Sequence, residues 1–376
     1  MSFFKAIFLF ALLMVLFTGC ATKVEQKPHL SKANLQEVSW DEMAGFEKDN
    51  LELSFEVFKK ACTKSKRYEN LKDIWNKANQ FEIENSKEFF TQYFTPYRLL
   101  DENNGQEGLI TGYYEPILNG SLVKTDVYKY PIYKTPKDIL IVDFGSLYPE
   151  LKDYRLRGKV IGNKVVPYDS REEIESQNNL EAICYVDDKV DLFFLHIQGS
   201  GKVKLQDGNI INVGYSQQNG RGYYPVGRKL IEEGYISQED MSLQAIRKWL
   251  KENPTQIDET LNLNESYIFF TQSEKTATGS LGVPLVANRN LAVDRSYIPL
   301  GFPVFIDTTN PLTQIPIQQL MVAADTGGAI KGEIRADFFF GNGKKAEKLA
   351  GIMKQKGSLY ILIPNNIKNI DTKSEG

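Results

Sequence analysis

The chain has 376 residues, with 45 basic and 48 acidic side chains and a formal net charge of -3. An electrostatic field this weak does not select a polyanion, which excludes nucleic acid as the main partner. The length exceeds that of one usual hydrophobic core, so we expect two packed units.

The N-terminus indicates export. Lys5 is followed by an uncharged run over 6–17, about half of the ~20 residues needed to cross a bilayer, and small residues precede Cys20. This order predicts a lipoprotein signal peptide at 1–19, with Cys20 as the acylated first residue of a tether at 20–38. Ala21, rather than aspartate, favours an outer-membrane lipoprotein facing the periplasm. A signal peptide cut elsewhere or a short membrane anchor is the alternative, and either would still export the chain.

Beyond the tether, the hydrophobic spacing changes several times along the chain. The expected regions are, in chain order, helical at 40–97, β-rich at 108–213, helical again at 226–261, and β-rich from 267 with one helix at 343–355. Many short strands bounded by glycine and proline predict a mainly β protein with helices, built around a small barrel or sandwich.

Residue counts exclude most enzyme classes. The two histidines are His29, in the tether, and His196, so a Ser-His-Asp or Cys-His site would have to use His196. No HExxH or paired CxxC motif offers zinc ligands, and we expect no catalytic metal. Cys62 and Cys184 are equally compatible with a disulfide and with free thiols. Carboxylate acid–base chemistry remains, as glycosidic bond cleavage uses it.

The densest constellation is VAADTGGAIKG followed by RADFFFG, at 322–341. An apolar strand delivers Asp325 into glycines, and Asp337 stands among an alanine and three phenylalanines. We expect both carboxyls where water is scarce, because desolvation raises a carboxyl pKa as a general acid requires. The alternative is that Asp325 braces the turn and Asp337 pairs with Arg335 or Lys331.

These segments resemble the membrane-bound lytic murein transglycosylase A family, whose C-terminal part is a barrel domain with three aspartates. Further matching motifs, in chain order, are GYYEP at 112–116, HIQGSG at 196–201, GYSQQNGRGYYPVGR at 214–228 and ANRNLAVDRSYIPLG at 287–301. The resemblance covers nearly the whole mature chain.

The resemblance implies a fold of two parts. A main domain with a double-psi β-barrel would comprise 39–115 and 216–376, with the barrel core at about 267–364. A smaller β domain would be inserted at 116–215. A groove between the two would hold glycan strands of peptidoglycan, and cell-wall synthases are the candidate protein partners.

The resemblance also implies an activity, which is cleavage of the β-1,4 bond between N-acetylmuramic acid and N-acetylglucosamine to leave a 1,6-anhydromuramic end, without a cofactor. The family's catalytic aspartate falls on Asp337, and Asp294 and Asp325 match the other two. Candidate sugar-binding residues are Tyr113, Tyr114, Gln198, Gly199, Ser200, Gly201 and Lys331, of which Lys331 would otherwise pair with Asp325. The rival interpretations are a hydrolase that uses water as its nucleophile and a non-catalytic peptidoglycan-binding lipoprotein.

Overall fold

A computed structural model describes residues 32–64, 72–151, 154–273 and 277–367. The expected signal peptide and Cys20 lie outside the described residues. Among the described residues, no helix has both the length and the apolar character that a membrane span requires.

A helical layer covers one end of the molecule, as predicted for 40–97. Its elements are β1 (Asn34–Glu37), η2 (Trp40–Glu42), η3 (Phe46–Lys48), α2 (Leu51–Cys62), α3 (Lys72–Gln80), η5 (Ile83–Asn85) and α4 (Ser86–Tyr93). Asn50 caps α2 by accepting a hydrogen bond from the Leu53 amide. The apolar helix faces meet in a cluster of phenylalanines, in which the Phe55 and Phe89 ring centroids lie 4.7 Å apart. Burial of these rings fixes the layer against the sheet beneath it.

The main sheet closes on itself to form a barrel. Its further strands are β2 (Phe94–Leu100), β3 (Gly108–Glu115), β13 (Asn290–Val293), β14 (Pro303–Thr309), β15 (Pro316–Asp325), β16 (Arg335–Asn342) and β17 (Lys354–Pro364). The strand order is β1-β2-β17-β14-β15-β13-β16-β3, and β17 pairs with β3 as well, which completes the ring. Helix α10 (Gly343–Ile352) packs beside β3 and β16. The barrel therefore joins an early strand to the C-terminal ones.

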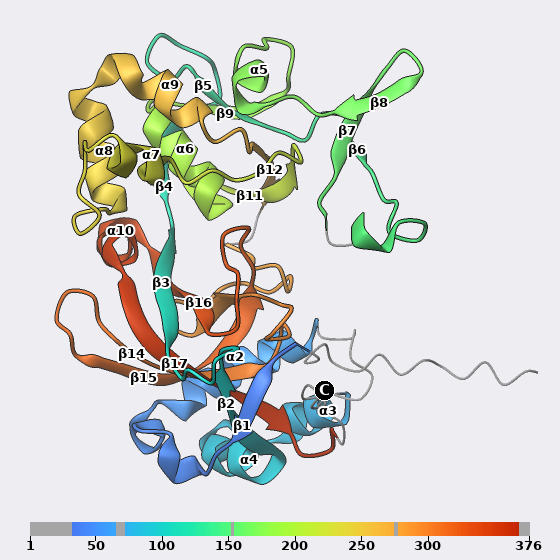
Figure 1. Ribbon diagram of the computed structural model, residues 1–376, viewed down its shortest axis with the longest axis vertical. Helices are drawn as coiled ribbons and strands as arrows, with labels where there is room; N and C mark the ends of the chain where they lie inside the picture. The colour runs from blue at the N-terminus through green and yellow to red at the C-terminus, as the bar shows by residue number, and fades with distance from the viewer. Residues whose placement is uncertain (1–31, 65–71, 152–153, 274–276, 368–376) are drawn as a thin grey trace, which may run out of the picture.

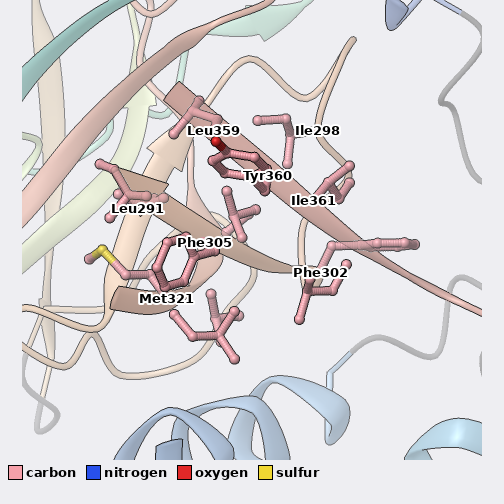
Figure 2. Close-up of a cluster of buried hydrophobic side chains, with 14 of the residues drawn as sticks. Leu291, Ile298, Phe302, Phe305, Met321, Leu359, Tyr360 and Ile361 are labelled. Carbon is pink, nitrogen blue, oxygen red and sulfur yellow. The ribbon is translucent and has the colours of Figure 1, made fainter. Parts of the chain in front are cut away.

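The barrel interior is apolar and continuous with the helical layer. Figure 2 shows side chains from several strands meeting there, among them Leu291, Met321, Leu359 and Ile361. All four residues are fully buried, with an exposed fraction of 0%. Each such side chain contributes about 1.5–3 kcal/mol to folding through burial.

A second unit is built on another sheet, of order β12-β11-β10-β4-β9-β5. Its strands are β4 (Ile117–Ser121), β5 (Tyr130–Tyr133), β9 (Ala182–Val186), β10 (Ser200–Leu205), β11 (Ile210–Gln218) and β12 (Ile268–Ser273). Its helices are α5 (Arg171–Glu175), α6 (Lys189–Gln198), α7 (Val226–Glu232), α8 (Leu243–Glu252), η7 (Pro254–Gln256) and α9 (Ile257–Asn262). A small sheet of β6 (Leu140–Ile141), β7 (Arg157–Ile161) and β8 (Lys164–Pro167), with η6 (Pro149–Leu151), projects from its side (Figure 1).

The sheet topology corrects the expected boundaries. β1 pairs with β2 in the main sheet, so the tether does not extend to residue 38. β12 pairs with β11 in the second sheet, so the barrel core does not begin at 267, and the inserted unit does not end at 215. Residues of α7, α8 and α9 bury their apolar faces against Phe193 and Phe194 of α6. The segment 216–273 therefore belongs to the inserted unit, because its hydrophobic surface is covered there.

Helix α6 was not expected within the β-rich stretch. Asp188 caps it by accepting a hydrogen bond from the Asp191 amide, and Gly199 ends it with a left-handed φ of 76°. The expected mainly β architecture with helices is otherwise confirmed. In Figure 1 the inserted unit lies above the barrel and the helical layer below it, with β3 leading from one to the other.

Candidate functional site

Residues of β16 alternate between the two faces of the barrel wall. Ala336 and Phe338 are buried in the interior, whereas Arg335 and Asp337 contact each other on the opposite, outer face. We expected the apolar sequence neighbours of Asp337 to desolvate its carboxyl group. For Ala336 and Phe338 this expectation is wrong. Strand alternation directs their side chains away from Asp337.

Strand register brings four residues side by side on the outer face. Ala292 of β13 pairs with Asp325 of β15 on one side and with Asp337 of β16 on the other. Asp337 in turn pairs with Thr111 of β3. Residues paired in this way direct their side chains to the same face. We call Asp325, Ala292, Asp337 and Thr111 the carboxylate row.

A register shift in β15 places Asp325 in this row. Leu291 pairs with Ala323, but the next residue, Ala292, pairs with Asp325, so Ala324 is the extra residue of a bulge. Without the bulge, regular alternation would direct Asp325 toward the barrel interior. The bulge thus decides which face carries this carboxyl group.

Asp337 is held through one of its two carboxylate oxygens. The Arg335 guanidinium lies 2.5 Å from Oδ1, and the Thr111 hydroxyl donates to the same oxygen. Arg335 also donates to the Thr111 hydroxyl at 2.9 Å, which closes a triangle of side chains. Oδ2 accepts no hydrogen bond from the described residues, and the Asp337 side chain is 18% exposed. The alternative in which Asp337 pairs with Arg335 is thus what the structure shows, with the second oxygen left available.

Asp325 is more enclosed and is fixed by a serine. Its Oδ1 accepts hydrogen bonds from the Ser280 amide at 2.9 Å, the Ser280 hydroxyl at 2.8 Å and the Thr326 amide at 2.8 Å. Burial raises the pKa of Asp325 even though these donors act to lower it. The sequence-based expectation of a raised carboxyl pKa is confirmed here, and Asp325 also braces its turn.

Asp294 serves the backbone rather than the carboxylate row. It is 7% exposed, and its two oxygens accept hydrogen bonds from the Ser296 amide at 3.0 Å and the Gly332 amide at 3.1 Å. It therefore ties the end of β13 to the glycine-rich loop that follows Asp325. Lys331 in this loop is exposed and forms no ion pair with any described residue.

Two tyrosines adjoin the row, one from each unit. Tyr113 lies two residues after Thr111 on the same face of β3 and packs against Phe339, with ring centroids 4.9 Å apart. Burial and the charges of the two row aspartates raise the pKa of Tyr113 well above its ordinary value. Tyr223 precedes α7 in the inserted unit and is 45% exposed, and desolvation by its surroundings and the charge of Asp337 raise its pKa. The inserted unit therefore brings Tyr223 within electrostatic range of the carboxylate row.

The other expected sugar-binding residues lie at the junction of the two units. Tyr114 packs on the opposite side of β3 against Ala346 and Ala350 of α10, and burial raises its pKa to about 12. The Gln198 side chain accepts a hydrogen bond from the Tyr114 amide at 3.1 Å. These two residues therefore join the barrel to α6 and do not contact the carboxylate row.

Local backbone geometry and packing explain why glycine occupies positions 199 and 201. Gly199 ends α6 with its positive φ, and Ser200 begins β10. A Cβ on Gly201 would lie 2.5 Å from a Leu195 methyl and 3.1 Å from the Pro116 carbonyl oxygen, so no side chain fits there. The segment is a helix end followed by a strand.

Thr111, Tyr223 and Ser280 were not among the expected site residues. Each reaches the site through pairing or packing with a distant part of the chain, such as the register between Thr111 and Asp337. Period-two alternation along TGYYEP, at 111–116, could have assigned Thr111 and Tyr113 to one face. Nothing in the sequence indicated which strand would lie beside them.

Groups other than carboxylates offer little chemistry in the described residues. No cluster of three or more His, Cys, Asp or Glu side chains that could hold a metal occurs among them. Cys62 and Cys184 are free and buried in separate cores. His196 is 4% exposed, its Nδ1 lies 2.9 Å from Arg171, and burial and the arginine charge lower its pKa. His196 is therefore part of the core of the inserted unit.

A pocket of about 560 Å³ opens in the inserted unit next to Tyr223. Its walls are mostly apolar and include Phe193, Ile197 and Ile246, with Arg228 and Glu232 also lining it. Tyr223 thus lies between this pocket and the carboxylate row.

Comparisons with known proteins place these features in a family. Residues 109–271 match the MltA specific insert domain, and residues 289–363 match the 3D domain. The crystal structure of membrane-bound lytic murein transglycosylase from Agrobacterium tumefaciens is 31% identical, with a TM-score of 0.80 over 88% of this chain and 98% of that chain. The chain belongs to the MltA family of membrane-bound lytic murein transglycosylases.

Two further relatives of this family are similar to the chain. Membrane-bound lytic murein transglycosylase A of Escherichia coli (strain K12) is 32% identical over 269 residues, which are 67% of this chain. The matched region spans 64% of that relative's length. The crystal structure of E. coli MltA with bound chitohexaose is 26% identical, with a TM-score of 0.67 over 84% of this chain and 90% of that chain.

Family membership confirms the expected fold class. The 3D domain match covers β13 to β17 of the closed ring, which is a double-psi barrel, and the MltA insert match covers β3 of that ring as well as the second sheet with its helices. The insert match extends to residue 271, which agrees with the pairing of β12 in the second sheet.

Proposed function

We propose that the chain is a lytic transglycosylase that cleaves the β-1,4 bond between N-acetylmuramic acid and N-acetylglucosamine and leaves a 1,6-anhydromuramic end. The carboxylate row on the outer face of the barrel carries this proposal, because it presents a free carboxylate oxygen of Asp337 on the side that Tyr223 of the inserted unit approaches. The chitohexaose bound to the E. coli relative supports a glycan ligand. The strand would lie in a groove between barrel and insert.

Asp337 would transfer protons in both halves of the reaction. As an acid it protonates the glycosidic oxygen while the bond from that oxygen to C1 breaks. As a carboxylate it then accepts the proton of the muramic acid C6 hydroxyl while O6 bonds to C1, so no water is consumed. One carboxyl group is sufficient because the attacking hydroxyl belongs to the same sugar, which supplies proximity.

The neighbours of Asp337 fit the second half of this cycle directly. Arg335 and Thr111 stabilise the negative charge that proton donation leaves on Oδ1. A sugar that covers the row would exclude water from it, which strengthens the interactions of Asp337 with Arg335 and Thr111. Asp325 would tune the row, and Asp294 would hold the glycine-rich loop at its edge.

Hydrolysis of the same bond is a second candidate function. Asp325 and Asp337 flank Ala292 and are therefore two strand spacings apart, roughly 9.5 Å between backbones. Inverting glycosidases hold their acid and base carboxyl groups roughly 6.5–9.5 Å apart to admit a water, and two side chains on one face at this backbone spacing allow such a separation. Asp294 is less suited as the base, because both of its oxygens accept backbone hydrogen bonds.

Mass spectrometry of digested sacculi separates the candidates. We expect anhydromuropeptides, which are lighter by one water than the products of hydrolysis. Reducing ends would refute the transglycosylase and establish the hydrolase. Intact sacculi that retain bound protein would favour the non-catalytic binding lipoprotein.

We further propose that the protein is an outer-membrane lipoprotein facing the periplasm, anchored through Cys20. The N-terminal sequence supports this placement, and the relatives are named membrane-bound. Cys20→Ala should leave a protein in the soluble fraction that still cuts isolated sacculi. Retention of this variant in the membrane would contradict the anchor. Cell-wall synthases stay a prediction of the resemblance.

A further inference from the structure

The described strands show the chain passing between the barrel and the inserted unit twice. At the first crossing, 115–117, β3 ends and β4 begins (Figure 1). The second crossing leads from Ser273, at the end of β12, to Ala277, which packs against the barrel beside Tyr113. The relative placement of the two units depends on what fixes these crossings.

Glu115 joins both crossings through its carboxylate. Its side chain is 3% exposed. One oxygen accepts a hydrogen bond from the Ala277 amide at 3.1 Å, and the other lies 3.3 Å from the Lys202 ammonium. Lys202, on β10 of the inserted unit, also donates its backbone amide to the Pro116 carbonyl at 2.8 Å. One buried acid therefore ties the first crossing to the second and to the inserted sheet.

The same strand carries the reacting face. Thr111, Tyr113 and Glu115 alternate along β3 and share one side of it. The Thr111 hydroxyl donates a hydrogen bond to Asp337. Burial and the charges of both row aspartates raise the pKa of Tyr113. One strand face therefore links Glu115 to the carboxylate row.

Two further contacts join the units. The Tyr114 amide donates to the Gln198 side chain of α6 at 3.1 Å. Gln244 of α8 donates to the Glu347 carbonyl of α10 at 3.1 Å, and Arg247 lies 3.5 Å from the Glu347 carboxylate. These contacts would keep the units together if Glu115 were changed.

We propose that Glu115 is a positioning residue for the reaction, which sets the inserted unit over the carboxylate row so that one glycan strand is held from both sides. The inference rests on the proposed function. It assigns Glu115 no contact with the sugar and no proton transfer.

Three variants separate this role from simple stabilisation. Glu115→Ala removes both contacts, whereas Glu115→Gln keeps an acceptor for the Ala277 amide and loses the charge opposite Lys202. Asp49→Asn is the matched control within the main domain. Asp49 is also 3% exposed, pairs with buried Arg289 at 2.8 Å and accepts a backbone hydrogen bond from the Leu320 amide at 2.7 Å.

The first measurement needs no substrate. Spin labels are placed at the exposed positions Lys48 and Lys204 through cysteine substitutions in a Cys20→Ala background, one label on each unit. We expect a broader or shifted distance distribution in Glu115→Ala, a smaller change in Glu115→Gln, and the wild-type distribution in Asp49→Asn. Unchanged distances in both Glu115 variants would overturn the proposal, whatever happens to activity.

The second measurement uses polymeric glycan strands. We expect kcat/KM to fall about tenfold or more in Glu115→Ala, mainly through KM, because uniform binding is lost while the row itself is kept. Asp49→Asn should lower Tm without raising KM. A Glu115→Ala enzyme with an altered label distance but wild-type KM would also overturn the positioning role. If the wild type forms no anhydromuropeptides, the proposed function fails. The label distances would still test whether Glu115 positions the inserted unit.

Discussion

Two regions of the molecule hold charged side chains away from bulk water and differ in how those charges are satisfied. In the inserted unit, Arg171 is 1% exposed and donates to the Asn264 carbonyl at 2.9 Å, the Ser266 carbonyl at 2.5 Å and the His196 ring. On the outer face of the barrel, the described residues hold Asp337 through one of its oxygens, Oδ1. The first region is closed, and the second keeps an unused acceptor.

The difference indicates which charged groups stabilise the fold and which can react. Arg171 is enclosed by fixed backbone acceptors and by the rings of Phe193 and Tyr267, so no substrate atom can reach it. The carboxylate row lies on a barrel face that the inserted unit approaches through Tyr223. A buried charge is thus weak evidence for function unless one of its polar atoms is left without a partner.

The largest expected effect tests the reactive side of this comparison. Asp337→Asn keeps the shape of the side chain but removes the titrating proton, so turnover should fall about 10²–10⁴-fold or below detection. Release of anhydromuropeptides measures turnover, and sedimentation with intact sacculi should show binding close to that of the wild type. Near-normal turnover would refute the assignment of Asp337.

The next effect tests the closed region. Arg171→Met leaves its backbone acceptors without their donor and leaves Glu175 paired with Lys189 alone, and we expect a loss of about 3–5 kcal/mol in the free energy of unfolding. Denaturant titration measures this loss, and the turnover per folded molecule should not change. Arg335→Met is the matched variant. It should change stability much less and alter the pH profile of turnover, and the reverse pattern would break the comparison.

The smallest effect concerns the pH dependence of stability. The pKa of Asp325 is raised by burial above its ordinary value of 3.8, so the folded state binds this proton more tightly than the unfolded chain. Its contribution to stability is therefore fully present below 3.8 and is lost as pH rises through the folded pKa. Asp325→Asn should remove this part of the decline, a difference of about 2–4 °C in Tm. Parallel Tm curves against pH for variant and wild type would contradict the raised pKa.

Local patterns in the sequence were sufficient for some elements. Helices α7, α8 and α9 lie close to the expected ranges, because apolar residues recur at helical spacing there and Ser242 caps α8. Helix α6 was missed, since its sequence VDLFFLHIQ is apolar on nearly every side and shows no clear period. A helix enclosed on all sides resembles a buried strand in sequence.

Non-local pairing explains what the sequence could not provide. The three aspartates could be singled out from their motifs, but their different environments depend on register. Asp337 has Arg335 beside it because they are two residues apart on one strand, and Thr111 joins them only through the parallel pairing of β3 with β16. The assignment of β12 to the inserted unit likewise depends on a partner strand, β11, that ends 50 residues earlier in the chain.

The bulge at Ala324 has a consequence for how this segment tolerates change. Substitutions nearby alter only the volume or polarity of a side chain. Deletion of a single residue there would instead turn the Asp325 side chain from the outer face of the barrel wall to the apolar interior. An ionised group would then have to enter the space filled by Leu291 and Met321. Homologous barrels should therefore accept many replacements along β15 and few insertions or deletions within it.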